Sequence, residues 1–432
     1  MGTSPISLSA YGRILRRNRN FRLLWLAQMV SELGDWFYSI AIYSLLLDLT
    51  RSAEAVALAV VLQVLPQFFI SPMAGVVNDR VSRKKIMILA DVARAVIVLG
   101  MLLVRTPELV PLLYLLLLLQ TFMWSFFEPG RTAVIPVITG SKEDTLVANA
   151  LSSTTWSFNL AAGSAIGGFV AVAFGRDTVF IVNALTFVVS AMFLRSMRFD
   201  EPHTVGSRPF GPRDLVDLSP MIEGLRYVMS NARLVATLLV KAGLGMLGAH
   251  WVFLPLFGQR VVPVDLGYLD AERAGMLGMS LLMGSRGVGA LIGPLIGGYW
   301  AGHDRRKMRQ GILIGFCTVG AGYIALAYAP EIVTAALAVI LANAGGSLIW
   351  VFSTTLLHYQ ADDRFRGRVF SADFGLMVLT MSSVSYMVGV AVDMSLPLRT
   401  ASLITGLIAV IPIMLWTGWA MPLWRREPAE SD

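Results

Sequence analysis

Long hydrophobic runs alternate with short polar connectors along the whole chain. Twelve runs are centred near residues 35, 65, 95, 119, 160, 186, 245, 285, 319, 344, 380 and 411. Each run is close to the ~20 residues that an α-helix needs to cross the hydrocarbon core of a bilayer. The pattern therefore predicts an all-α polytopic membrane protein with twelve transmembrane helices, grouped as two bundles of six.

Composition supports this class and excludes a soluble protein. Of 432 residues, 56% are hydrophobic and only 15% are charged, which is typical of a polytopic membrane protein. The formal charge of +7 does not indicate nucleic-acid binding, because the basic residues gather in every second connector. The positive-inside rule then places both termini in the cytoplasm. The single cysteine, Cys317, excludes an intrachain disulfide and a cysteine-based metal site. We expect no metal and no cofactor.

The two halves of the chain resemble each other in sequence. At an offset of 222 residues, Pro72 falls on Pro294, Gly75 on Gly297, Arg83 on Arg305, Lys84 on Arg306, Lys85 on Lys307, Lys142 on Arg364 and Val147 on Val369. We therefore predict an N-terminal bundle over residues 1–195, a cytoplasmic linker over 196–232, a C-terminal bundle over 233–422 and a cytoplasmic tail over 423–432. Apolar positions between Leu215 and Val228 predict a short surface helix in the linker.

The connector between the second and third predicted helices packs one acid and four bases into a short run. The run is Gly75-Val-Val-Asn-Asp79-Arg80-Val-Ser-Arg83-Lys84-Lys85. It resembles the signature of the major facilitator superfamily, which has a glycine, three residues, Asp-Arg, two residues and two basic residues at this place. The resemblance implies two pseudo-symmetric six-helix bundles with a substrate site between them near the middle of the membrane.

The resemblance also implies a conformational latch on the cytoplasmic side. Asp79 is placed to meet the positive N-terminus of the eleventh helix, near residues 367–370. In the superfamily, an acid at the place of Glu128 often pairs with the second basic position of the signature, here Arg83. Neither acid is repeated at the 222 offset, which suggests that the two work together. The predicted latch residues are Gly75, Asp79, Arg80, Arg83, Lys84 and Glu128. The alternative is that these positive charges only set topology.

Two acidic residues lie within the first predicted helix. Glu32 and Asp35 are three residues apart and so share one helical face. Asp35 lies about 22 Å along the helix from its cytoplasmic end. An ionised side chain near the bilayer centre costs roughly 2.5–3.5 kcal/mol on insertion scales. We therefore predict that Asp35 and Glu32 carry a proton or contact substrate. The alternative is that each is a polar group held in place by neighbouring helices.

Three basic residues within predicted helices are further candidates for proton coupling or substrate binding. Arg94 lies one turn from Asp91 on the third helix, so one interpretation is a structural ion pair. The other is that Arg94 reaches Asp35 or an anionic substrate. Lys241 and Arg286 are the buried cations of the second half and are candidate substrate contacts. We predict no catalytic residue, since no nucleophile arrangement and no phosphate-binding loop is present.

Shorter motifs resemble the branch of macrolide-efflux and enterobactin-exporter-like proteins. These motifs are Asn20-Phe-Arg-Leu-Leu-Trp25, Gly34-Asp35-Trp36, Glu128-Pro-Gly-Arg131 and Ala148-Asn-Ala-Leu151. The resemblance implies a secondary transporter of the bacterial inner membrane that exports a drug, macrolide or siderophore in exchange for protons by alternating access. We expect a monomer whose partners are a small-molecule substrate, protons and lipids, without nucleic acid. Import, facilitated diffusion and lysophospholipid flipping stay open on the same fold. A non-transporting sensor and a polytopic membrane enzyme are the alternatives of a different class.

Overall fold

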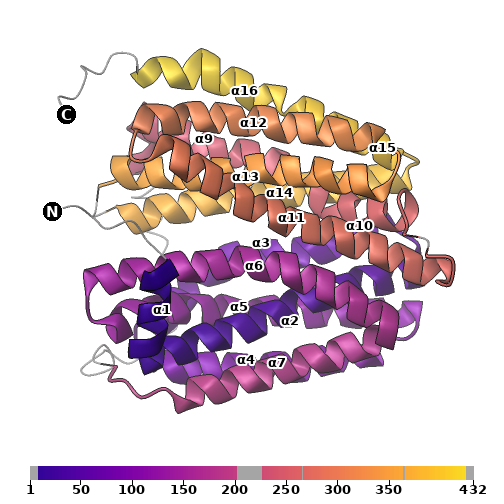
Figure 1. The fold of residues 1–432 in the computed structure, drawn as a ribbon, viewed down its shortest axis with the longest axis horizontal. Coiled ribbons are helices and arrows are strands. Elements are labelled where there is room, and N and C mark those ends of the chain that lie inside the picture. The colour runs from indigo at the N-terminus through magenta and orange to yellow at the C-terminus, as the bar shows by residue number, and fades with distance from the viewer. Residues whose placement is uncertain (1–7, 202–225, 265, 363–364, 425–432) are drawn as a thin grey trace. The chain divides into compact units, whose positions relative to one another are not determined.

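The fold is a set of long helices joined by tight connectors. The computed structural model describes residues 8–201, 226–264, 266–362 and 365–424, and over these ranges the chain forms helices and turns without a strand. Figure 1 shows the long helices of each half running alongside one another. The predicted all-α class is confirmed. The surface helix predicted between Leu215 and Val228 lies mostly outside the described residues.

The first half, over its described residues 8–201, contains seven α-helices. They are α1 Leu8–Arg17, α2 Arg19–Thr50, α3 Ala53–Asn78, α4 Arg83–Gly100, α5 Val110–Thr139, α6 Lys142–Phe174 and α7 Arg176–Ser196, with the short 3-10 turns η1 Met101–Leu103 and η2 Pro107–Leu109 between α4 and α5. Helix α1 carries the basic residues Arg13, Arg16 and Arg17.

The described part of the second half contains eight α-helices after residue 231. They are α9 Ala232–Met246, α10 His250–Arg260, α11 Ala271–Ala301, α12 Arg305–Tyr328, α13 Ile332–Gln360, α14 Arg366–Asp393, α15 Leu398–Ile408 and α16 Val410–Leu415, followed by the π-helical turn η5 Trp416–Ala420 and the 3-10 turn η6 Met421–Trp424. All twelve predicted centres fall within the helices of the two halves. The seventh and twelfth predicted spans are each broken once, into α9 with α10 and into α15 with α16.

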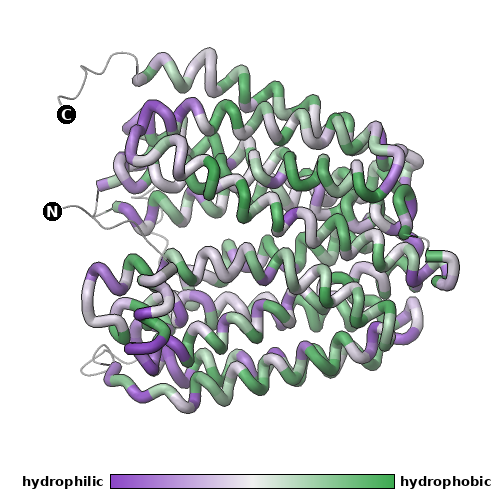
Figure 2. Tube along the Cα trace, in the orientation of Figure 1, coloured by the Kyte–Doolittle hydropathy of each residue, from purple (hydrophilic) through white to green (hydrophobic). Residues whose placement is uncertain are grey.

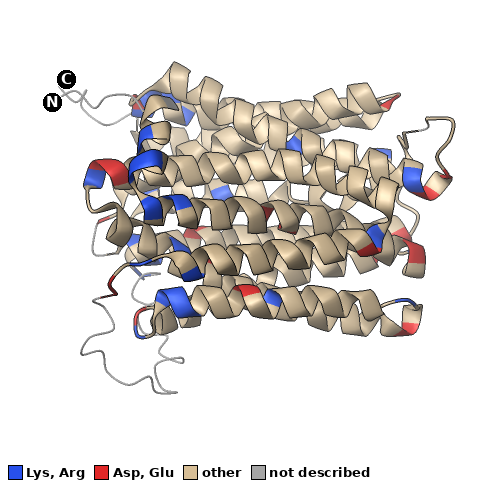
Figure 3. Cartoon of the chain, turned by 60° about the horizontal axis from the view of Figure 1, so that its bottom comes forward, with Lys and Arg blue, Asp and Glu red and all other residues tan. Residues whose placement is uncertain are grey.

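Eleven helical segments of the described chain are long and apolar enough to cross a membrane. They account for every predicted span except the first, which is α2. With 32 residues, α2 is long enough, but polar side chains such as Glu32 and Asp35 lower its mean hydropathy. Figure 2 shows hydrophobic residues along the helices and hydrophilic ones toward their ends, and Figure 3 shows most charged residues near helix ends. The acids in α2 therefore interrupt an otherwise apolar span.

Short polar residues end the helices and allow the tight connectors. Ser82 caps α4, where its hydroxyl accepts a hydrogen bond from the backbone N–H of Lys85 at 3.2 Å. Gly140 ends α5 with φ 72°, a left-handed conformation that glycine adopts at little cost. Ser141 then caps α6, where its hydroxyl accepts a hydrogen bond from the backbone N–H of Asp144 at 3.0 Å. These caps satisfy backbone groups that a helix end would otherwise leave unpaired.

Contacts between residues divide the chain into two compact units. One comprises Met1–Thr50 and Leu62–Val216, and the other comprises Arg51–Val61 and Asp217–Asp432. Within the first, α2 packs against α6 and α7, and α4 packs against α5 and α7. Within the second, α13 packs against α11 and α12, and α9 packs against α14. The predicted domain boundaries at 195 and 232 stay a prediction.

Small residues of α6 bring it close to α2. A Cβ atom added at Gly167 would lie 2.5 Å from the Cα of Phe37, and one added at Gly163 would lie 2.7 Å from the Cβ of Trp36. Such distances are too short for any side chain, so only glycine permits this approach. The contact holds α2 firmly and fixes the direction in which its polar residues point.

Candidate functional site

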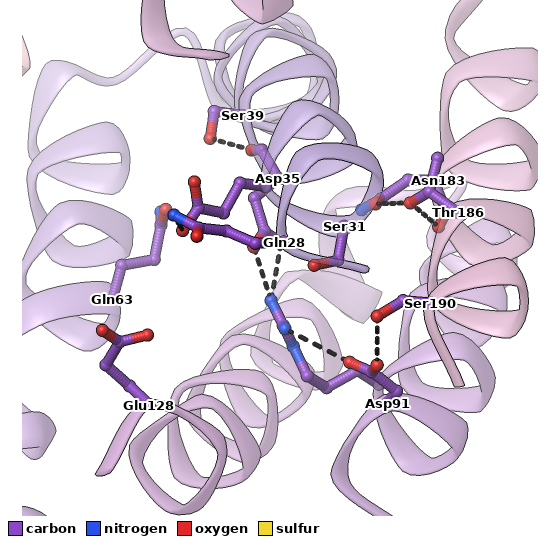
Figure 4. A network of polar contacts seen from close by, with 12 residues as sticks. Gln28, Ser31, Asp35, Ser39, Gln63, Asp91, Glu128, Asn183, Thr186 and Ser190 are labelled. Carbon is purple, nitrogen blue, oxygen red and sulfur yellow. Dashed lines mark hydrogen bonds and ion pairs between the residues drawn. The ribbon is translucent and has the colours of Figure 1, made fainter. Parts of the chain in front are cut away.

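An arginine of α4 lies between two acids of the first unit. The Nη2 atom of Arg94 donates to both carboxylate oxygens of Asp35 on α2, at 2.7 Å each. Its Nη1 atom lies 3.8 Å from Oδ1 of Asp91, one turn earlier on α4. Ser190 on α7 donates its hydroxyl to the other oxygen of Asp91 at 2.6 Å. Figure 4 shows Asp35, Asp91 and Ser190 converging on this point. We call Asp35, Asp91 and Arg94 the Arg94 triad.

The Arg94 triad is deeply buried but not uniformly so. The side chain of Asp91 is 0% exposed and that of Arg94 is 3% exposed, whereas that of Asp35 is 21% exposed. The guanidinium of Arg94 also stacks on the ring of Phe187, 4.1 Å from its centre. One guanidinium thus lies next to two carboxylates, and Asp35 is the acid whose side chain is more exposed to solvent. Both sequence interpretations of Arg94, the pair with Asp91 and the contact with Asp35, describe part of this geometry.

A second polar group surrounds Arg131 on α5. Nε and Nη2 of Arg131 bind the two oxygens of Glu128 at 2.9 and 2.5 Å. Nη1 of Arg131 donates to the amide oxygen of Gln28 at 3.0 Å, and the Gln28 amide nitrogen donates to Glu32 at 2.9 Å. Asn159 on α6 donates to the other oxygen of Glu32 at 3.2 Å. We call Gln28, Glu32, Glu128, Arg131 and Asn159 the Arg131 cluster.

The predicted pairing of Glu128 with Arg83 is wrong. Glu128 lies eleven residues before the end of α5 at Thr139, about 16 Å inside the helix, and its carboxylate binds Arg131. The resemblance to the superfamily suggested Arg83 as the partner, whereas the nearest base lies one turn away on α5 itself. Arg131 is the residue that the sequence interpretation missed, although an acid and a base three residues apart on a helix are a signal for a pair.

The signature connector attaches to the ends of other helices of the first unit. Arg83 donates to the backbone oxygens of Asn78 and Ala133, both at 3.2 Å, and lies 3.3 Å from Asp79. Lys84 donates to the backbone oxygen of Met197 at 2.6 Å. The carboxylate of Asp79 is 74% exposed, so its ion pair with Arg83 is weak. Helix α14 begins at Arg366, close to where the partner of Asp79 was expected. The latch formed by Gly75, Asp79, Arg80, Arg83 and Lys84 stays a prediction.

The second unit holds its own buried charges. Lys241 on α9 pairs with Asp373 on α14 at 3.1 Å, donates to Thr354 at 3.1 Å and lies 3.6 Å from the ring centre of Trp350. Asp373 was missed, although the argument that a charge in an apolar span needs an explanation applies to it equally. A buried acid beside Lys241 makes a structural pair the simplest reading of that lysine.

Arg286 on α11 stacks on an aromatic side chain. Its guanidinium lies 3.8 Å from the ring centre of Trp251 on α10, and the side chain is almost fully buried. Cation–π contacts of this kind stabilise a buried cation by up to about 2 kcal/mol. The predicted role of Arg286 and Lys241 in substrate binding stays a prediction.

Comparison with known proteins identifies the family. Residues 24–389 match the model of the Major Facilitator Superfamily. The chain is 25% identical over 366 residues to macrolide efflux protein A of Streptococcus pyogenes, covering 84% of this chain and 86% of that protein. It is 23% identical over 398 residues to the putative bacilysin exporter BacE of Bacillus subtilis strain 168, covering 91% of each. The match to the uncharacterized transporter YkuC of the same strain is 26% identical and spans 65% of each chain.

Solved structures share the fold. The nucleoside transporter NupG superposes with a TM-score of 0.67 at 15% identity, covering 92% of this chain and 98% of that one. A bacterial homologue of the human lysosomal transporter Spinster superposes with a TM-score of 0.69 at 12% identity, covering 96% and 100%. At such low identity these similarities concern the fold alone. The match over residues 24–389 establishes that the chain belongs to the major facilitator superfamily and is a multi-pass membrane transporter, not an enzyme.

Proposed function

We propose that this protein exports an amphipathic small molecule across the bacterial inner membrane in exchange for protons, by alternating access, with both termini in the cytoplasm. The names of its relatives support export, since they describe macrolide efflux, bacilysin export and, at 26% identity over 395 residues, the multidrug efflux pump Tap of Mycobacterium bovis. The observation that carries the proton coupling is the Arg94 triad, in which one guanidinium faces two acids.

The triad can exist in two charge arrangements. When Asp35 is ionised, it holds Arg94 through two hydrogen bonds of 2.7 Å. A proton on Asp35 removes that attraction. Arg94 then has only the ionised Asp91 as its ion-pair partner in the triad, at 3.8 Å on the same helix. Because Asp35 belongs to α2 and Arg94 to α4, protonation changes the force between two helices. Proton binding is thereby linked to the relative stability of two conformations.

Transport in inverted membrane vesicles tests this function. We would screen macrolides, peptides and fluorescent amphipathic dyes for uptake with an acidic vesicle interior, and compare the wild type with Asp35→Asn. The exposed acid Asp177, in the first turn of α7, gives the control Asp177→Asn. Export coupled to protons predicts uptake that grows with the pH gradient, is lost in Asp35→Asn and is kept in the control. Gradient-driven uptake that persists in a correctly inserted Asp35→Asn protein would remove Asp35 from this role.

The same assay separates the alternatives. Movement that follows only the substrate gradient would indicate facilitated diffusion. Uptake in right-side-out vesicles with an acidic exterior would indicate import. If a fluorescent lysophospholipid crosses the bilayer while the panel compounds do not, the protein is a lipid flippase.

A further inference from the structure

The Arg131 cluster repeats the charge pattern of the Arg94 triad on other helices. In each, one arginine and two acids belong to the same polar group, and one of those acids comes from α2. Arg94 binds Asp35 directly, whereas Arg131 binds Glu128 directly and is linked to Glu32 through Gln28. Asp35 of α2 binds Arg94 of α4. Glu32, three residues earlier, binds Asn159 of α6 and is linked through Gln28 to Arg131 of α5. The two acids of α2 thus belong to two separate polar groups. The proposed function uses only the Arg94 triad.

Most of the Arg131 cluster is buried in the first unit; Glu32 is half-buried, and the side chain of Glu128 is 27% exposed. Gln28 and Asn159 are 2% and 0% exposed, and the side chain of Arg131 is 9% exposed. Glu32 lies thirteen residues after the start of α2 at Arg19, about 20 Å along the helix. With Glu32 and Glu128 both ionised, this buried group would hold an excess negative charge. Burial opposes an uncompensated charge, and binding one proton removes it.

The contacts indicate which acid takes the proton. Both oxygens of Glu128 are held by Arg131 through a two-point ion pair. Glu32 has only the amide donors of Gln28 and Asn159 on its oxygens. The charged groups acting on it are Arg131 and Glu128 on α5, and Asp35 stands one turn away on α2. Of the two acids in this cluster, Glu32 is therefore the one whose negative charge is less stabilised by its hydrogen-bond partners.

Gln28 connects Glu32 to the arginine. Its amide oxygen accepts from Arg131, while its amide nitrogen donates to Glu32 at 2.9 Å and to the backbone oxygen of Ser152 at 3.1 Å. A protonated Glu32 is itself a hydrogen-bond donor, and the Gln28 oxygen is the acceptor beside it. Rotation of the Gln28 amide to accept from Glu32 would end its bond with Arg131. Gln28 is thus a positioning residue that transmits the state of Glu32 to α5.

We propose that Glu32 binds a second proton, independent of the one bound by the Arg94 triad, so that each transport cycle moves two protons. The proposal rests on the proposed function for its role in transport. The proton adds to a carboxylate oxygen of Glu32 from the water on one side of the membrane and leaves to the other side, without any other change in bonding.

Proton counting on the purified protein in liposomes tests the proposal without a substrate. We would measure proton uptake with a pH indicator as the medium is acidified, and follow the infrared C=O stretch of protonated carboxyl groups. The variants are Glu32→Gln, Asp35→Asn and the two together, and Glu143→Gln at the exposed start of α6 is the matched control. We expect two buried carboxyl bands in the wild type, one in each single variant and none in the double variant.

The outcomes separate the two proposals. If Glu32→Gln keeps both bands and the full proton count, the second site is overturned while the Arg94 triad stands. If Asp35→Asn keeps both carboxyl bands, and transport does not depend on the pH gradient, the proposed function fails instead. Glu32→Asp should restore the proton count, which a purely structural role would not require. Should Glu32→Gln fail to fold, the number of bands in the wild type still decides, since a single band overturns two-proton binding.

Discussion

Replacing Arg94 with methionine should be severely destabilising. The change keeps an unbranched side chain of similar length against Phe187 but removes the charge that Asp35 and Asp91 share. Asp35 loses two charge-assisted hydrogen bonds of 2.7 Å. Asp91, which is 0% exposed, keeps only the hydroxyl of Ser190 as a hydrogen-bond donor. Removing one partner of a buried ion pair typically costs about 3–5 kcal/mol, so we expect a loss of roughly 3 kcal/mol or more.

The exposed pair of Arg105 and Asp177 supplies a matched control. Its two hydrogen bonds, 2.9 and 2.7 Å long, resemble those of Arg94 with Asp35. The two side chains are 58% and 48% exposed, however, and a solvent-exposed pair contributes less than about 1 kcal/mol. Arg105→Met should therefore change stability far less than Arg94→Met, although both remove the same chemical group. Burial, not bond length, makes the difference.

Equilibrium unfolding in mixed detergent micelles measures both variants. A loss of 3 kcal/mol raises the unfolding equilibrium constant more than about a hundredfold, whereas 1 kcal/mol raises it about fivefold. Adding Asp91→Asn to Arg94→Met removes one of the stranded acids, so the double variant should recover part of the loss. If Arg94→Met is no worse than Arg105→Met, or if the double variant recovers nothing, the account of the triad as a shared ion pair is wrong.

Three further predictions concern helix caps and the packing of α6 against α2. Asp393 accepts hydrogen bonds from the backbone N–H groups of Ala53 and Glu54 at the start of α3, at 2.7 and 3.0 Å. Asp393→Ala should therefore lower the free energy of unfolding by about 1 kcal/mol. An unchanged free energy of unfolding would contradict this cap. Gly167→Leu should cost more than about 3 kcal/mol and abolish a monodisperse elution profile, because its side chain has no space beside α2; normal elution and stability would show that the helices can separate. The backbone N–H groups of Lys307 and then Arg306 lower the pKa of Asp304 below its usual value. The stability contributed by Asp304 is therefore complete above about pH 4, the usual pKa of an unfolded aspartate, and is lost as the pH falls through the lowered value. Melting temperatures across acidic pH should fall less steeply in Asp304→Ala, and parallel curves would refute this cap.

The sequence was informative where a residue acts through its type and spacing. Asp35 and Glu32 were recognised because acids are rare in apolar spans, and Arg94 because it lies one turn from Asp91. The same rule would have found Asp373 and Arg131, had every charge in a span been weighed. The pairing of Glu128 was misjudged for another reason. Its partner was chosen by analogy with a family pattern, whereas the structure places it well inside α5 with Arg131 one turn away.

The sequence by itself determined the class of the protein and the course of the chain. Hydrophobic runs of membrane-spanning length specify helices, because a bilayer leaves no other way to satisfy backbone hydrogen bonds within a single segment. The signature run from Gly75 to Lys85 indicated the family. These properties depend on local composition and spacing, which can be read along one dimension.

Only the tertiary structure decided how the buried charges are shared. The pairing of each arginine with an acid depends on how each helix is rotated about its axis and on the distance between helices. A close approach such as that of Gly167 to Phe37 fixes both the rotation and the distance. Asp35 and Glu32 share a face of α2 in the sequence, yet they join different arginines from α4 and α5. A helical period predicts a face, but it cannot predict which neighbour stands opposite, because that choice comes from the packing of helices distant in sequence.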